Sequence, residues 1–86
     1  DRNKQATRVF SYGLLMNSVC MSKREASIEG FDESIGLTEW EKTVVRTAQK
    51  HGLTKRSDTD FKAKRPILRQ ELFIVASKLL EWAQET

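Results

Sequence analysis

The sequence has few of the residues that cross-link a fold or take part in catalysis. It contains one cysteine, one histidine and one proline among 86 residues. Cys20 therefore cannot form a disulfide within the chain, and His51 cannot complete a zinc site or a nucleophile–histidine pair on its own. The motifs GxGxxG, GxxxxGK[ST] and HExxH are also missing. We therefore expect a protein that is not an enzyme and that uses no metal or cofactor.

Long apolar runs are missing as well. No stretch approaches the ~20 residues that span a bilayer, and the chain starts at Asp1 without a methionine or a signal-like segment. We expect a processed product or a fragment. A chain of 86 residues has room for one domain and buries only roughly 60–65% of its unfolded surface. Its core is therefore marginal, and we expect a partner or close helix packing to support it.

A helix is predicted over residues 38–51. Thr38 and Glu41 have the spacing of a capping box, in which each side chain bonds to the other residue's backbone N–H. Gly52 favours the left-handed conformation that ends a helix. The apolar stripe of this helix consists of Trp40, Val44, Val45 and Ala48.

A second helix is predicted over residues 66–84, with Pro66 in its first turn. The expected inner stripe is Leu68, Leu72, Val75, Leu79 and Trp82. Further apolar residues widen the surface beyond one face, namely Ile67, Phe73, Ile74, Ala76, Leu80 and Ala83. Either this helix is buried on two sides or it carries a surface for another molecule, and the sequence weighs the two equally.

Residues 1–30 are predicted as an N-terminal helical segment. One helix is expected from Lys4 to about Met21, with Cys20 as a small buried apolar residue or, in an oxidising compartment, as half of an intermolecular disulfide. The capping-box spacing of Ser22 and Glu25 predicts a short helix up to about Glu29. No alternating strand pair is visible. The fold class is therefore all-α: one domain over residues 1–86, with two main helices, a basic loop between them and an N-terminal helix.

Positive charge is concentrated in residues 46–69. This stretch holds eight basic and two acidic residues, a net charge of +6, whereas the whole chain carries +3. Such a surface attracts phosphate backbones, acidic polysaccharides, acidic proteins or anionic lipids. A solvated loop that charge keeps soluble is an equally weighted interpretation. Phe61 is the only aromatic residue in the stretch, whereas single-strand nucleic-acid binders usually present several stacking rings.

The segment from Phe31 to about Ala83 resembles one S-layer homology motif, the unit by which many bacteria hold surface proteins on their cell wall. That family opens with a phenylalanine and an aspartate before a helix that starts near a tryptophan, as Phe31, Asp32 and Trp40 do here. Gly52 and the aliphatic residue after it match the end of the family's first helix. The resemblance divides the chain into residues 1–30 and a helix-loop-helix unit over residues 31–84.

The second half of the motif matches in spacing and departs in detail. The family continues with a phenylalanine, a proline–isoleucine pair and then threonine, arginine, alanine and glutamate. Phe61, Pro66, Ile67, Arg69 and Glu71 keep this interval. The departures are Leu68 and Gln70 within the signature, Ala63 in place of a proline, and a loop over residues 54–60 without glycine. Thr7 and Arg8 are similar to the start of another such signature but lack its glutamate, and the family normally uses three motifs together.

The resemblance implies a set of binding residues. Arg69 would recognise an anion through its guanidinium fork, Glu71 would orient Arg69 or cap the helix, and Trp40 would line a groove or stack on a sugar. Each also has a structural interpretation, as a surface cation, a first-turn acid and a core residue respectively. The basic loop would add Arg56, Lys62, Lys64 and Arg65 to the site.

Three hypotheses follow from the sequence. The first is a binding module of S-layer-homology type that docks onto an anionic cell-envelope polymer or a neighbouring protein, at the envelope or secreted. The second is a small subunit of a larger assembly, such as a virion, a membrane-associated complex or an organellar particle. The third is a nucleic-acid-binding protein that uses the basic stretch over residues 46–69.

Overall fold

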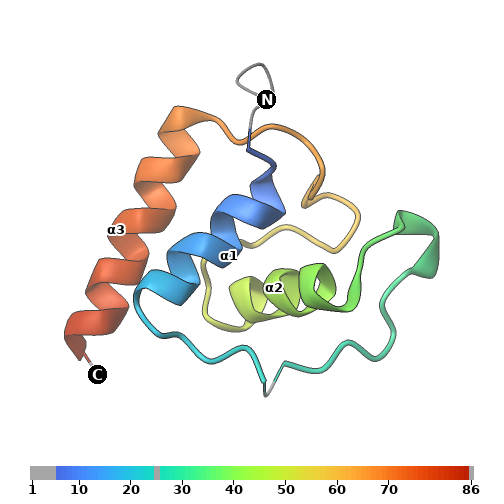
Figure 1. Cartoon of the computed structure of the whole chain (residues 1–86), viewed down its shortest axis with the longest axis horizontal. Coiled ribbons are helices and arrows are strands. Elements are labelled where there is room, and N and C mark those ends of the chain that lie inside the picture. Colours follow the sequence, from blue (N-terminus) through green and yellow to red (C-terminus); the bar gives the residue numbers. More distant parts are fainter. Residues whose placement is uncertain (1–5, 25, 86) are drawn as a thin grey trace.

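The computed structural model describes residues 6–24 and 26–85, and these residues form a small all-α domain. Its elements are α1 (Arg8–Ser18), the short 3-10 helix η1 (Glu33–Ile35), α2 (Glu39–Lys50) and α3 (Arg69–Glu85). Within the described ranges the only β-type pairing is an isolated bridge between Thr7 and Pro66. Figure 1 shows α1 between α2 and α3, and α1 contacts both. The predicted fold class is confirmed.

Helix α2 forms where the sequence predicts it. The Thr38 hydroxyl accepts a hydrogen bond from the Glu41 N–H at 3.2 Å, and the Glu41 carboxylate accepts one from the Thr38 N–H at 2.9 Å. Gly52 follows the helix with φ +71°. Burial acts to raise the pKa of Glu41, but the hydrogen bonds from Lys64 and Thr38 outweigh it and lower the pKa below its usual range.

Helix α3 begins three residues later than predicted, because the chain before it bonds to another part of the protein. Pro66 lies opposite Thr7 in the isolated bridge, and the Ile67 N–H donates to the Ala6 carbonyl at 3.1 Å. The first helical bond runs from the Leu72 N–H to the Leu68 carbonyl. Placing Pro66 in the first turn is therefore wrong: a contact between distant segments overrides its local preference.

The N-terminal helix is shorter than predicted. It starts after the cap residue Thr7 and ends at Ser18, while Lys4 lies outside the described residues. Cys20, in the left-handed conformation with φ 58°, turns the chain after the helix and is exposed. Its expected burial is wrong.

The short helix predicted up to Glu29 is also wrong for the residues that the structure describes there. The Ser22 hydroxyl accepts from the Arg24 N–H, and Ser27 does the same for Glu29. These local turns compete with helix formation. Glu25, the other member of the predicted capping box, lies outside the described residues.

The core lies where the three helices meet and is closed by loop residues. The helices contribute Val9, Tyr12, Met16, Val44, Val45, Ala48, Val75 and Leu79, and the loops add Met21, Phe31, Leu37, Leu53, Phe61 and Ala63. Phe61, the one aromatic residue of the basic stretch, is fully buried. His51 contacts Trp82 edge to face at 5.9 Å, which ties the end of α2 to α3.

Gly13 sets how closely α1 approaches α2. A Cβ atom at this position would lie 2.4 Å from the Trp40 ring, so only glycine permits the observed distance. This close approach offsets the roughly 1 kcal/mol by which glycine weakens a helix interior. Trp40 lies over Gly13 and beside Phe10, with ring centroids 6.5 Å apart, and remains exposed on its other side.

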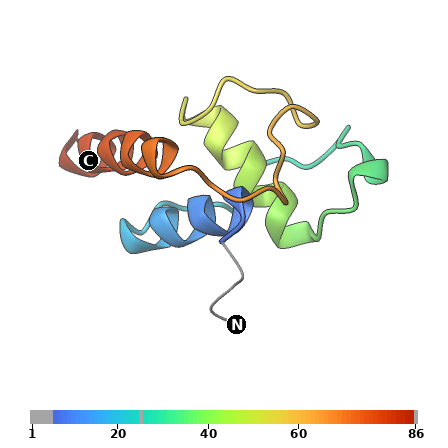
Figure 2. The ribbon, with the colours of Figure 1, turned by 90° about the horizontal axis from the view of Figure 1, so that it is seen from above.

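The inner face of α3 is narrower than predicted. Val75 and Leu79 are buried and Trp82 is partly buried, but Leu68 and Leu72 are exposed. Figure 2 shows that α3 lies along α1 at one side of the domain, with α2 on the other side of α1. Because only one side of α3 meets the core, its wide apolar surface faces outward.

Candidate anion-binding site

The site is built around Arg8, at the start of α1. The carbonyls of Arg65 and Ala63 accept the N–H groups of Arg8 and Val9 at 2.8 and 3.1 Å. First-turn N–H groups of a helix have no partner within the helix. The loop before α3 supplies these partners, and its docking brings basic side chains beside Arg8.

The Arg8 side chain is only 7% exposed and is held from three directions. Its Nε donates to the Phe61 carbonyl at 2.6 Å, its Nη1 forms an ion pair with Glu71, and its Cζ lies 5.1 Å from the centroid of the Phe61 ring. The Nη2 atom is buried and has no hydrogen-bond partner among the described residues. The guanidinium therefore keeps one unused donor.

Tyr12 completes the cluster one turn further along α1. Its ring meets Phe61 edge to face at 4.9 Å, and its hydroxyl donates to the second oxygen of Glu71 at 3.1 Å. Burial, the charge of Glu71 and this hydrogen bond raise the pKa of Tyr12 to about 12. Tyr12 is thus a neutral donor at physiological pH. Glu71 therefore orients Arg8 and Tyr12, whereas the resemblance assigned it to Arg69.

Two adjoining hollows open beside this cluster, and we call them together the basic cleft. The first has a volume of about 480 Å³ and is lined by Arg8, Arg56, Lys62, Arg65, Pro66 and Leu68. The second, of about 360 Å³, shares Arg8, Arg56 and Leu68 and adds Lys55, Lys78 and Glu71 to its charged lining. The cleft therefore contains six basic residues and one acidic residue, and the acid is already paired with Arg8.

Four of the predicted binding residues meet at this cleft, and one of them, Glu71, is the acid that is paired with Arg8. Arg56, Lys62 and Arg65 line it, and all three are exposed. Lys62 has φ 57°, a left-handed conformation that costs a residue with a side chain about 1–2 kcal/mol. Strain of this kind is often found at functional sites.

The other predicted residues lie elsewhere. Lys64 forms an ion pair with Glu41 at the start of α2. Trp40 lines a separate hollow of about 470 Å³ with Met21, Lys23 and Arg24. The Arg69 side chain is exposed, lines neither hollow of the basic cleft and makes no hydrogen bond or ion pair with a described residue.

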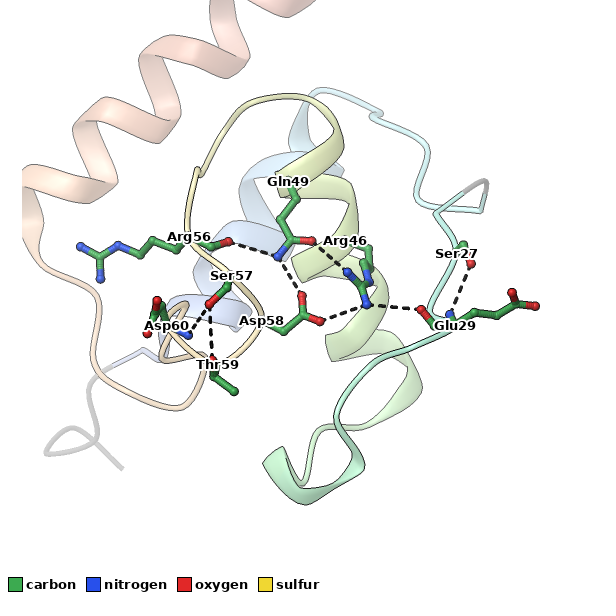
Figure 3. A network of polar contacts seen from close by, with 9 residues as sticks. All are labelled: Ser27, Glu29, Arg46, Gln49, Arg56, Ser57, Asp58, Thr59 and Asp60. Carbon is green, nitrogen blue, oxygen red and sulfur yellow. Dashed lines mark hydrogen bonds and ion pairs between the residues drawn. The ribbon is translucent and has the colours of Figure 1, made fainter.

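In a second arginine cluster, Arg46 of the basic stretch is paired with a carboxylate. Arg46 forms an ion pair with Asp58 at 3.0 Å, and Gln49 donates to the same carboxylate at 2.8 Å. Gln49 also donates to the Arg56 carbonyl at 3.2 Å. Figure 3 shows the Arg56 guanidinium pointing away from this network. The network therefore fixes the Arg56 backbone and leaves its charge to the cleft.

Sequence reasoning missed Arg8 as the centre of the site. Its only signal is the Thr7–Arg8 pair, which is similar to the start of a second motif. Its contacts with Phe61 and Glu71 cross more than fifty residues of sequence, so no local pattern reveals them.

Comparisons with known protein families, with curated proteins and with solved structures gave no match for this chain. Within the part of the chain that the structure describes, no helix has the length and apolar character needed to cross a membrane. No group of three or more potential metal ligands occurs among the same residues. The site itself therefore carries the functional argument.

Proposed function

We propose that this chain is a non-catalytic binding module of S-layer-homology type that binds an anionic polymer in the basic cleft. The observation that carries the proposal is the convergence of Arg8, Arg56, Lys62 and Arg65 on one hollow. A carboxylate or phosphate is the ligand class for such a site, because arginine forks pair with these groups bidentately.

Preorganisation of the cleft supports the proposal. Arg8 is fixed by Phe61 and Glu71, the backbone of Arg56 is fixed by Gln49, and the loop around Lys62 is docked onto α1. The Arg8 charge is therefore already positioned and loses little conformational entropy when a ligand binds.

The resemblance supplies the type of polymer. An acidic cell-envelope polysaccharide offers repeated carboxylates or phosphates along one chain, and the two hollows can hold neighbouring groups. A cell-envelope location follows from the proposal. The shape of the site agrees less well with single-stranded nucleic acid, because Tyr12 and Phe61, the aromatic residues of the cluster, are buried against each other and cannot stack on bases.

Titration of the chain with purified acidic cell-wall polysaccharide in a calorimeter measures the binding affinity and tests the proposal. We expect the combined variant Lys62→Ala with Arg65→Ala to weaken binding about tenfold or more, and binding to weaken as salt is raised. Arg69→Ala is the matched control, since it removes an exposed cation just outside the cleft, and it should bind like the native chain.

Three results would overturn the proposal. They are no binding by the native chain, equal binding by the double variant, or a loss confined to Arg69→Ala, which would favour the site implied by the resemblance alone. A parallel titration with a DNA or RNA oligonucleotide distinguishes the nucleic-acid hypothesis from the polysaccharide proposal. Tighter binding to the oligonucleotide than to the polysaccharide, again lost in the double variant, would replace the polymer with nucleic acid.

A further inference from the structure

The second hollow of the basic cleft has an apolar side as well as a charged one. It is lined by α3, by the loop that follows α2 and by the start of α1. Its apolar lining consists of Leu53, Leu68, Ile74 and Val75. Leu53 and Val75 belong to the core, whereas Leu68 and Ile74 are 67% and 51% exposed. The hollow therefore presents two large aliphatic side chains to solvent.

Cationic side chains line the same hollow. Lys55, Arg56 and Lys78 are all exposed there. The Lys78 ammonium donates to the Gly52 carbonyl at 3.4 Å, and a neutral acceptor does not cancel its charge. A simple anion would satisfy these cations and leave the aliphatic side chains in water. A ligand that carries an apolar group beside its anion would use both parts of the lining.

The junction of the two hollows determines where each part of such a ligand lies. Arg8, Arg56 and Leu68 line both hollows. An anionic group held by the two arginines therefore lies beside Leu68, and a group attached to it can extend along the second hollow to Ile74. This contact removes apolar surface from water on both the ligand and the protein, which stabilises the complex.

We propose, building on the function proposed above, that the second hollow selects polymer repeat units in which an apolar substituent stands beside the anionic group. The anion lies against Arg8 and Arg56, and a short acyl or alkyl group extends from it onto Leu68 and Ile74. The first hollow holds a neighbouring anionic group of the same polymer. The cations then attract anionic polymers in general, and the aliphatic contacts determine which of them binds best.

Titration of the whole chain with methyl phosphate and with butyl phosphate, followed by NMR chemical shifts, tests this inference. The two probes carry the same anionic group, and butyl phosphate has three more carbons. Burying about half of the added surface should make butyl phosphate bind about tenfold more tightly. The ratio of the two affinities reports the apolar contact, whereas the absolute affinities report the anion site on which the proposed function rests.

Ile74→Ser should bring the ratio close to one and leave the affinity for methyl phosphate unchanged. Phe73→Ser is the matched control, because Phe73 is also an exposed apolar residue of α3 but lines neither hollow, and it should keep the native ratio. Lys62→Ala combined with Arg65→Ala should weaken the binding of both probes by the same factor, so that the ratio stays. Circular dichroism checks that each variant keeps its helices.

Each contrary result has its own meaning. Equal binding of the two probes by the native chain, an unchanged ratio in Ile74→Ser, or an equal loss of the ratio in Phe73→Ser would overturn the inference and leave the proposed anion site intact. No binding of either probe would remove the anion site and the inference together.

A phospholipid also carries an anionic group beside acyl chains, so vesicles of phosphatidylglycerol distinguish the two sources of this chemistry. The native chain should not sediment with them at physiological salt, because the acyl chains of a lipid lie beneath its headgroup, inside the bilayer. Sedimentation with the vesicles that Ile74→Ser abolishes would assign the hollow to a lipid and overturn its assignment to a polymer.

Discussion

Two arginines in this domain have similar partners and different consequences. Arg8 and Arg46 each lie over a phenylalanine ring, at 5.1 and 4.9 Å, and each forms an ion pair with a carboxylate. Each also has one nitrogen without a hydrogen-bond partner, Nη2 of Arg8 and Nε of Arg46. The local chemistry is therefore nearly the same.

The surroundings of the two arginines differ. The Arg8 side chain is 7% exposed and joins two helices and a loop, whereas the Arg46 side chain is 25% exposed and joins α2 to two loops. Further cations gather beside Arg8, but the amide of Gln49 and the carbonyl of Glu29 close the Arg46 cluster with neutral groups. One cluster thus borders a ligand-sized hollow and the other fastens loops.

The largest expected difference between the clusters is in stability. Arg8→Ala should lower the free energy of unfolding by about 3 kcal/mol, because it leaves the partly buried carboxylate of Glu71 without its cation. Urea denaturation followed by circular dichroism measures the change. The combined replacement Arg8→Met with Glu71→Leu should cost clearly less, since it removes both charges. Equal costs for the single and combined variants would contradict this explanation.

Arg46→Ala should cost less, about 2 kcal/mol, because its pair is more exposed and Gln49 still donates to Asp58. The same denaturation experiment measures it, and hydrogen exchange should show faster opening of residues 56–60. Arg46→Lys keeps the charge but not the fork, so it should recover only part of the loss. If Arg46→Ala were as damaging as Arg8→Ala, the contrast in burial would not explain the two roles.

Tyr12 gives the Arg8 cluster a response to alkaline pH. The folded state keeps the Tyr12 proton up to a pKa of about 12, whereas the unfolded chain loses it near pH ~10. Between these values the folded state binds more protons, so the free energy of unfolding must fall as pH rises. Tyr12→Phe should remove this part of the fall.

The chain contains one tyrosine, so its ultraviolet absorbance on ionisation reports this group directly. Glu71→Gln should move the titration toward the ordinary tyrosine value, because it removes the carboxylate that helps to hold the proton. A native midpoint near that of free tyrosine would contradict the buried hydrogen bond.

The smallest expected effect concerns Lys62, the residue of the basic cleft with a left-handed backbone conformation. Glycine tolerates the φ of 57° seen at Lys62, so Lys62→Gly should be about 1 kcal/mol more stable than Lys62→Ala. Both variants should bind the anionic polymer equally weakly, because both lose the ammonium group. Equal stability of the two variants would show that the strain is not significant.

Local sequence patterns predicted the helix whose two ends carry clear capping signals. Thr38, Glu41 and Gly52 mark both ends of α2, and the structure has the predicted capping box. The start of α3 and the short helix near Ser22 were not predictable in this way. At Pro66 a bond to Thr7 replaced the local preference, and at Ser22 a turn within three residues did so.

The candidate site was only half visible in the sequence. The concentration of charge over residues 46–69 pointed to Arg56, Lys62 and Arg65, which line the basic cleft, because a basic stretch needs no tertiary information to be seen. It could not separate these from Lys64 and Arg46, which the fold neutralises with Glu41 and Asp58.

The sequence by itself determined an all-α chain with one well-marked helix and one cationic loop, because capping, periodicity and charge act over a few residues. Tertiary structure alone decided that Arg8 joins that loop, that Glu71 pairs with Arg8, and that the apolar surface of α3 faces outward. These outcomes depend on which distant segments meet, and that is set by how the helices share one small core.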